Sequence, residues 1–413
     1  MTSTARAGRG SGPDARRGPA AGRSRARGGV PDRRGLAVLT ASHVVDDLYQ
    51  GAVPALLPFL VLERGYSYAE ATGITLAATV LSSVLQPAFG VLSDRRPLPW
   101  LTPAGLLVAG VGIALAGVGS SYWWTWAAVA LSGLGVAAYH PEAARAARAA
   151  AGPSAQGMSW FVLGGNSGLA LGPVVVTPLL LAHGVAGTPL LALPALLMAV
   201  FLVRLQRRAR ALAGGAAAVR RAAAGDGADD WRAFGWLTVL VVIRSILFFG
   251  VSSLVALHVI ARFGVAPSAG SATLVTFLAV GALGTLAGGW IADRYTRLAA
   301  IRLGYALSLP ALLLLLAAPV FPVAVGAAAL LGLGLYLPFS VQTTLGQECL
   351  PNRVGTASGV TLGLTVSAGG IFAPVLGALA DAHGLTWALA SLVVLPPVAL
   401  LASLRLGARV RRR

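Results

Sequence analysis

The chain has 413 residues, of which 56% are hydrophobic and only 11% are charged. A soluble domain carries about 25% charged residues, so this composition excludes an ordinary soluble protein. The net charge of +18 comes from 32 basic residues, all of them Arg, and few of these lie in the apolar body. We therefore expect a membrane protein in contact with the lipid bilayer and no nucleic-acid partner.

Residues 1–34 hold nine Arg among Gly, Ala, Ser and Pro, which is typical of a disordered basic tail. The pair Arg33-Arg34 ahead of an apolar segment resembles a twin-arginine export signal. However, that segment is too long for such a signal and contains two carboxylates. We interpret it as the first permanent span and expect the tail to hold the N-terminus in the cytoplasm.

Twelve apolar segments follow one another along the chain, each ended by Gly, Pro or charged residues. They lie near 36–62, 68–93, 100–119, 122–144, 156–182, 186–204, 233–260, 268–292, 298–318, 322–347, 354–380 and 385–405. With the N-terminus inside, 29 of the 32 Arg fall on the cytoplasmic side, as the positive-inside rule requires. We predict an all-α membrane protein with twelve transmembrane helices and both termini in the cytoplasm.

Features of the first half recur in the second half, as in Gly51 and Gly250, which lie 199 positions apart. An even number of spans per repeat predicts two pseudo-symmetric six-helix bundles related by an axis along the membrane normal. The predicted segments are a cytoplasmic N-tail at 1–34, a bundle at 35–206, a cytoplasmic linker at 207–231, a bundle at 232–406 and a basic C-tail at 407–413.

The first apolar segment carries a polar face. His43, Asp46, Asp47 and Gln50 fall within about a third of the helix circumference at about 100° per residue. Ionisable groups inside a membrane are costly and face a bundle interior or a wet cavity. Burial and mutual repulsion favour protonation of Asp46 or Asp47, which would let that residue carry a proton as access alternates. His43 titrates near neutrality and is placed to relay protons from the cytoplasm.

Arg244 lies at almost the same depth in the seventh segment, the repeat mate of the first. Its guanidinium suits bidentate binding of a phosphonate or a carboxylate. A structural alternative stays open, in which Asp46 and Asp47 are the counter-ions of Arg244 and His43 is a satisfied core histidine. Asn166, in a Gly-rich stretch of the fifth segment, is a candidate hydrogen-bond donor to a cavity.

A six-residue motif occurs twice, as Gly90-Val-Leu-Ser-Asp94-Arg95 and as Gly289-Trp-Ile-Ala-Asp293-Arg294. The two copies resemble the G-x-x-x-D-R loop of the major facilitator superfamily. Both sit where an even-numbered span leaves the membrane on the cytoplasmic side. The Asp and Arg side chains are placed to bridge neighbouring helix ends and latch that face, whereas a solvated turn is the simpler interpretation of either copy alone.

The first half is similar to the fosmidomycin-resistance branch of that superfamily. The matching stretches are Ser42-His43-Val-Val-Asp46-Asp47-Leu-Tyr49-Gln50-Gly-Ala-Val-Pro54-Ala-Leu-Leu-Pro58, Gln86-Pro87, Tyr139-His140-Pro141-Glu142 and Gly164-Gly165-Asn166-Ser-Gly168-Leu-Ala-Leu-Gly172-Pro173. The resemblance implies the fold of the superfamily and an antibiotic exporter driven by proton exchange. The expected substrate-binding residues are Arg244, Gln50, Tyr49, Asn166 and His140.

The cytoplasmic ends of two helices carry further candidate gates. Glu142 and Arg145 are three residues apart, so they form either a gate or an intrahelical pair. Glu348 ends the tenth segment in a similar way, and we group it with Asp94, Arg95, Asp293 and Arg294. The residues expected to serve close packing and bending are Pro141, Gly168, Gly172 and Pro173.

The chain has no paired-Cys metal pattern, phosphate-cradling loop or Gly-x-Ser-x-Gly elbow, so we expect no enzyme, cofactor or metal centre. The favoured function is a proton-coupled antiporter in the inner (plasma) membrane. This monomer would export small drugs, with fosmidomycin-like phosphonates as the leading cargo. Two alternatives stay open. One is an importer or facilitator of a sugar or organic acid, and the other is a non-transporting sensor whose tails bind anionic lipid or a partner.

Overall fold

The computed structural model describes residues 32–95, 98–151, 155–212 and 228–410. Within these, only the backbone is described at 94–95, 155–159, 208–212, 354–356, 358–359, 362–364 and 409–410. The first half comprises α1 (Arg33–Arg64), α2 (Tyr68–Arg95), α3 (Leu101–Leu115), α4 (Tyr122–Ala151), α5 (Ala155–His183), η1 (Val185–Leu191) and α6 (Ala192–Leu212). The second half comprises α7 (Trp231–Phe263), α8 (Pro267–Arg294), α9 (Arg297–Ala317), α10 (Phe321–Tyr336), α11 (Phe339–Cys349), η2 (Pro351–Arg353), α12 (Val354–His383), α13 (Leu385–Ala390), η3 (Ser391–Val394) and α14 (Leu395–Val410).

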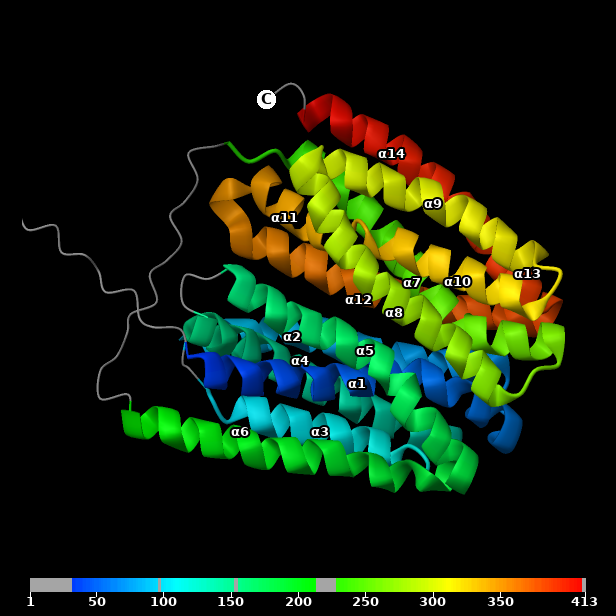
Figure 1. Ribbon diagram of the computed structural model, residues 1–413, viewed down its shortest axis with the longest axis horizontal. Coiled ribbons are helices and arrows are strands. Elements are labelled where there is room, and N and C mark those ends of the chain that lie inside the picture. Colours follow the sequence, from blue (N-terminus) through cyan, green and yellow to red (C-terminus); the bar gives the residue numbers. More distant parts are fainter. Residues whose placement is uncertain (1–31, 96–97, 152–154, 213–227, 411–413) are drawn as a thin grey trace, which may run out of the picture.

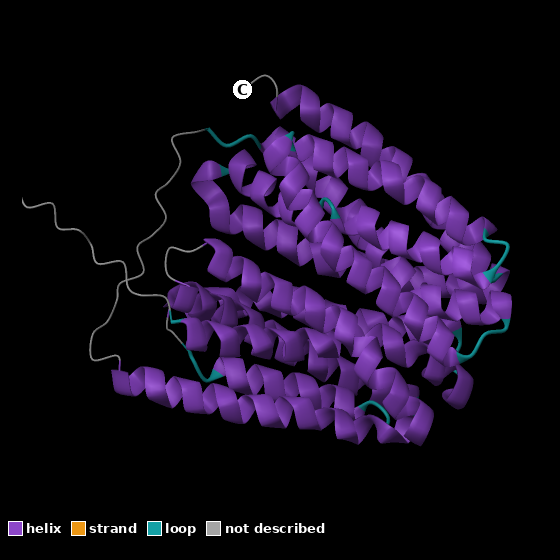
Figure 2. Cartoon of the chain, viewed as in Figure 1, coloured by secondary structure: helices purple, strands orange, loops and turns teal. Residues whose placement is uncertain are grey.

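The two halves form two bundles of nearly parallel helices that lie side by side (Figure 1). The described residues contain helices and loops and no strand (Figure 2). Among them, ten stretches are long and apolar enough to cross a membrane, with η1–α6, α10–α11 and α13–α14 each counting as one. The shorter α3 and the less apolar α4 complete twelve. The predicted all-α membrane fold with twelve transmembrane helices is confirmed.

Several helix ends differ from the predicted boundaries. The tenth span breaks between Tyr336 and Phe339, because Pro338 has no backbone N–H to continue the helix. The fourth helix runs to Ala151 and the sixth to Leu212, beyond the ends predicted near 144 and 204. Both extensions are rich in Ala and Arg, which favour helix. The sixth helix thus enters the stretch predicted as a linker.

The repeat is visible in how each half begins. Asp32 caps α1 and Asp230 caps α7, each accepting a hydrogen bond of 2.9 Å from the amide three residues later. The Asp32 amide also donates to the Ala150 carbonyl at 2.9 Å, and the Asp230 amide donates to the Cys349 carbonyl at 2.8 Å. In both halves the first helix is therefore tied to the end of the fourth. We call this end of the molecule the termini face and the opposite end, at Gly65, the far face.

The two halves meet along α2 and α12, along α5 and α8, and where α1 meets α7. Three hydrogen bonds join the halves among the described residues. The Asp381 carboxylate accepts from the Tyr68 amide at 2.7 Å and from the Ala69 amide at 2.8 Å, and Thr75 bonds Ser253 at 3.1 Å. Tyr68 begins α2 beside the far face. Asp381 therefore caps a helix of the opposite half and holds the far face closed.

We expect Asp381→Asn to loosen this closure, because the variant loses the charge that complements the amino end of α2. The expected effect is an increase of about fivefold in the population open at the far face. The measurement is the labelling rate of a cysteine placed at Ser82 of the cavity wall in a Cys349→Ser chain. The control is Glu70→Gln, since Glu70 accepts from Ser67 within the same half. Equal labelling in the two variants would contradict the capping role.

Close packing of α1 against α5 depends on glycine. A Cβ on Gly51 would collide with the backbone of Leu169, and a Cβ on Gly168 would collide with the backbone carbonyl of Val44. Gly172 meets α1 in the same way, at the backbone of Gly51 and of the residue after it. Backbone atoms cannot rotate away, so these positions admit only glycine at the present helix separation. This close approach is the one expected for Gly168 and Gly172.

We expect Gly51→Ala to lower the free energy of unfolding by about 1–3 kcal/mol, since α1 and α5 must move apart. The repeat mate supplies a matched control. A Cβ on Gly250 meets only the side-chain ends of Leu376, at 2.7 Å, and Leu392, at 3.1 Å. These ends can change rotamer, so Gly250→Ala should cost less. Thermal unfolding of the purified variants measures the difference, and an equal loss at both positions would refute the role of the backbone contact.

Candidate functional site

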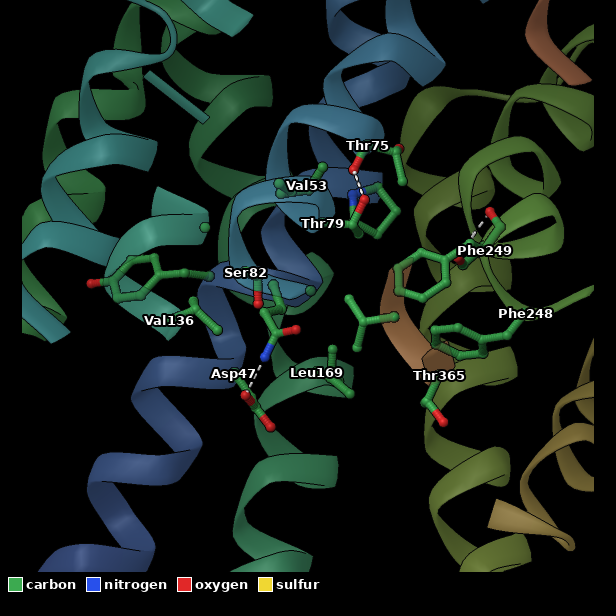
Figure 3. Close-up of a pocket in the computed structure, with 18 of the residues that line it drawn as sticks. Asp47, Val53, Thr75, Thr79, Ser82, Val136, Leu169, Phe248, Phe249 and Thr365 are labelled. Carbon is green, nitrogen blue, oxygen red and sulfur yellow. Dashed lines mark hydrogen bonds between the residues drawn. The ribbon is translucent and has the colours of Figure 1, made fainter. Parts of the chain in front are cut away.

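A cavity of about 310 Å³ lies between the two halves. Figure 3 shows Asp47, Val136 and Leu169 of the first half on one side and Phe248, Phe249 and Thr365 of the second half on the other. Much of the wall is apolar, with a few polar groups set into it, which is the usual make-up of a small-molecule site. The predicted site residues that line it are His43, Asp47, Tyr49, Gln50, His140, Asn166 and Arg244.

The polar face of α1 meets α4 at this cavity. The His140 Nε2 lies 3.3 Å from Asp47 Oδ1, and the His43 Nε2 lies 3.4 Å from Asp47 Oδ2. The two Nε2 atoms are themselves 3.3 Å apart. The Gln50 amide donates to Asp47 at 2.5 Å. The structure thus places four side chains of the predicted site in one cluster.

Backbone carbonyls hold the other nitrogen of each ring. The His43 Nδ1 lies 2.7 Å from the carbonyl of Phe161, whose ring stacks on the imidazole at 4.2 Å. The His140 Nδ1 lies 3.0 Å from the carbonyl of Val136, one turn earlier in α4. A carbonyl only accepts, so each Nδ1 carries the hydrogen and donates it. In the neutral rings both Nε2 atoms therefore present lone pairs to the cavity.

Asp46 is fully buried behind this cluster, with no exposed surface. Neither of its oxygens has a hydrogen-bond partner, and the His140 Nδ1 lies 3.4 Å from Oδ2. An uncompensated carboxylate is costly in a membrane interior. Asp46 and Asp47 are adjacent in the chain but occupy different environments.

Arg244 is buried in the second half and does not pair with these acids. Its Nε donates to Gln342 at 3.1 Å, and its guanidinium lies 4.7 Å from the centre of the Phe339 ring. No carboxylate among the described residues forms an ion pair with it, and its Nη2 is buried without a hydrogen-bond partner. The alternative in which Arg244 is the counter-ion of Asp46 or Asp47 does not hold in this conformation.

Asn166 and Tyr49, both predicted to contact the substrate, differ in whether their polar groups are available to a ligand. Asn166 of α5 is nearly buried at the cavity wall, where its amide can reach a ligand. The ring of Tyr49 reaches the cavity, but its hydroxyl donates to the Leu191 carbonyl and accepts from the Ala195 amide, both at 2.9 Å. The hydroxyl of Tyr49 therefore fastens α1 to α6 and points away from a bound molecule.

The candidate gates lie apart from the cavity, toward the termini face. Glu142 and Arg145 form an ion pair within α4, with Glu142 almost fully buried. Glu348 pairs with Arg297, which joins α11 to the start of α9. Pro173 lies inside α5 and Pro141 inside α4, and both helices continue through them.

The two Asp-Arg motifs contribute no ion pair among the described side chains. Asp293 and Arg294 are exposed, and the Arg294 guanidinium lies 5.5 Å from the centre of the Tyr295 ring. The side chains of Asp94 and Arg95 lie outside the described part of the chain. A latch built from these motifs stays a prediction.

Sequence reasoning missed the surroundings of Arg244. Gln342 holds Arg244 and donates to the hydroxyl of Tyr305 at 3.1 Å. Phe339 stands 199 positions after His140, so the two residues occupy equivalent positions of the repeat. The His140 ring lies beside the acids of α1, and the Phe339 ring lies beside Arg244 of α7. The sequence signals were a Gln in the middle of an apolar span and the repeat spacing itself.

The chain resembles known membrane transporters over most of its length. A family model described as Major Facilitator Superfamily matches residues 39–374. The uncharacterized MFS-type transporter YfnC of Bacillus subtilis (strain 168) is 31% identical over 383 residues, covering 89% of this chain and 92% of that protein. The fosmidomycin resistance protein of Escherichia coli (strain K12) is 30% identical over 353 residues, covering 84% of this chain and 86% of that protein.

Solved structures agree on the fold. A bacterial homolog of the human lysosomal transporter Spinster, in an inward-facing and occupied conformation, superposes with a TM-score of 0.76 at 14% identity, covering 90% of this chain and 96% of that one. A peptide transporter, POT, in complex with sulfate gives 0.72 at 16% identity, covering 93% and 96%. The helices, the cavity between the halves and these matches together establish that the chain belongs to the major facilitator superfamily.

Proposed function

We propose that the chain is a proton-coupled antiporter that exports small anionic drugs, with fosmidomycin-like phosphonates as the leading cargo. The observation that carries this proposal is the cavity, which holds an acid and histidine cluster from one half and an uncompensated Arg244 from the other. The relative in Escherichia coli named for fosmidomycin resistance supports the choice of cargo.

The cluster supports coupling to protons rather than to a nucleotide or another cofactor. Asp46, Asp47 and His43 are buried near the middle of α1, where a proton can change the charge of the cavity wall. Such a change alters the energy of each conformation, so proton binding from one side and release on the other can drive the halves to rock. His140 contacts both acids and joins this unit.

Arg244 supports an anionic cargo. Its Nη2 has no hydrogen-bond partner, and the guanidinium offers a planar pair of donors that suits a phosphonate or a carboxylate. Gln50 and Asn166 of the first half are placed to bind the polar remainder of the molecule. An anion leaving while protons enter is also driven by the membrane potential, at about 2.3 kcal/mol per charge per 100 mV.

The proposed setting is the inner membrane, with the termini face in the cytoplasm and the protein acting as a monomer. The sequence-based assignment of 29 of the 32 Arg to the cytoplasmic side supports this orientation. The three cross-half hydrogen bonds lie at or toward the far face, which then faces outward. They support a state that is closed on the outside.

The test is a drug-susceptibility panel in bacteria that lack their own exporters and express the chain. We expect resistance to fosmidomycin to rise and resistance to uncharged drugs of similar size to stay constant. A chain without residues 1–33 should behave the same, because the described residues that line the cavity begin at His43. Greater sensitivity would indicate import, and an unchanged panel with loss of a cellular response in the shortened chain would indicate a sensor.

A further inference from the structure

We propose that His43, Asp47 and His140 form a binding site for a divalent transition-metal ion of the Zn²⁺ class, with one coordination position open to the cavity. The inference rests on the geometry of three side chains and stands whether or not the proposed cargo is correct. It departs from our sequence-based expectation of no metal centre. That expectation relied on motif spacing, which does not detect ligands from two separate helices.

The three groups face one another with lone pairs. Each Nδ1 donates to a backbone carbonyl, at 2.7 Å for His43 and 3.0 Å for His140, so in the neutral rings both Nε2 atoms are left as acceptors. The Asp47 carboxylate is also an acceptor, and the Gln50 amide satisfies only one of its oxygens. Three acceptors in van der Waals contact repel one another unless a cation lies between them.

The spacing fits a metal ion better than a hydrogen bond. The distances are 3.3 Å between the two Nε2 atoms, 3.4 Å from the His43 Nε2 to Asp47 Oδ2 and 3.3 Å from the His140 Nε2 to Asp47 Oδ1. Charge-assisted hydrogen bonds are shorter, at about 2.7–2.9 Å. In a tetrahedral zinc site the bonds are about 2.0–2.1 Å, which places neighbouring ligands about 3.3–3.4 Å apart. The two Nε2 atoms have this separation, and each lies at this distance from a different oxygen of the Asp47 carboxylate, so the carboxylate faces the ion position with both oxygens.

The groups behind the ligands are those that metal sites use. Ligand histidines donate their second nitrogen to a carbonyl or a carboxylate, which fixes ring orientation. His43 meets the Phe161 carbonyl, and the Nδ1 of His140 lies beside both a carbonyl and the buried Asp46. Space is left by Gly165 of α5, where a Cβ would lie 2.7 Å from the His43 Nε2. Because Asp46 lies beside the Nδ1 of His140, it acts as a positioning residue for that ring.

The ligand set selects the kind of metal. Two imidazoles and one carboxylate suit Zn²⁺ and similar ions, whereas Mg²⁺ and Ca²⁺ require six or more oxygens. All three ligands line the cavity, so the fourth position faces it and accepts water or an anionic oxygen of a bound molecule. The same lone pairs hold protons when no metal is bound, so the two cations would occupy the site in turn.

The experiment is a titration of the purified full-length chain, without a polyhistidine tag, with Zn²⁺ in detergent micelles. We expect one tightly bound Zn²⁺ per chain by calorimetry. His43→Gln and His140→Gln should each abolish this stoichiometric binding. Asp46→Asn should weaken it by about 10- to 100-fold while keeping the stoichiometry. Substitution of Co²⁺ should give the strong visible absorption of a tetrahedral site.

Two other histidines provide matched controls. His258 is buried in α7 and His383 is exposed at the end of α12, and neither belongs to the cluster. His258→Gln and His383→Gln should bind Zn²⁺ as the parent does. The proposal is overturned if the parent binds no stoichiometric Zn²⁺, if His258→Gln loses as much as His140→Gln, or if Co²⁺ gives the weak spectrum of an octahedral ion. The Co²⁺ spectrum of the parent decides the question even where a variant does not fold.

Discussion

Asp47→Asn is expected to reduce gradient-driven export to the background level of cells without the transporter. Asn has nearly the same shape and can still accept from Gln50, but it cannot take up a proton or carry a charge. The cavity therefore keeps its form while its wall no longer changes charge between conformations. The measurement is drug accumulation in inverted membrane vesicles energised by an imposed pH gradient.

A second assay separates coupling from binding in the same variant. Exchange of labelled for unlabelled drug at equal concentrations requires rocking of the halves but no net proton movement. We expect this exchange to persist in Asp47→Asn. Asp46→Asn serves as the companion variant, because Asp46 is buried without hydrogen-bond partners while Asp47 is held by three side chains. Export at the parental rate in both variants would show that neither Asp46 nor Asp47 couples export to protons.

Arg244→Gln is expected to raise the KM for an anionic drug by about 10- to 150-fold, because a charge-assisted hydrogen bond contributes about 1.5–3 kcal/mol. The Nη2 of Arg244 has no hydrogen-bond partner in the protein, so a bound anion would supply one. The KM for uncharged substrates should rise much less. Transport rates over a range of drug concentrations, with anionic and uncharged analogues side by side, provide the measurement.

Arg244→Lys distinguishes recognition of shape from recognition of charge. Lys keeps the charge but loses the planar pair of donors and the bond from Nε to Gln342, so we expect an intermediate KM. Thermal unfolding of both variants shows whether Arg244 acts through stability instead. An unchanged KM together with a lower unfolding temperature would make Arg244 a structural residue packed on Phe339.

The transmembrane spans and the polar face of α1 could be predicted from the sequence, because both depend only on residues close together in the chain. Apolar stretches of about twenty residues must span a membrane, so the twelve helices followed from hydropathy. The polar face of α1 followed in the same way, since His43, Asp46 and Asp47 share one side of any helix. Helix ends were less certain, because the Ala-rich ends of α4 and α6 continue as helix beyond the apolar segment.

The sequence by itself determined the class of protein, its twelve spans, its internal repeat and the acids that face inward. Only the tertiary structure decided which groups meet those acids. Asp46 and Asp47 contact His140 of α4 rather than Arg244, and the hydroxyl of Tyr49 turns to α6 instead of the cavity. The physical reason is that these contacts depend on how closely helices approach and cross. The glycines of α1 and α5 allow these two helices to approach closely, but the sequence does not show which helix each glycine faces.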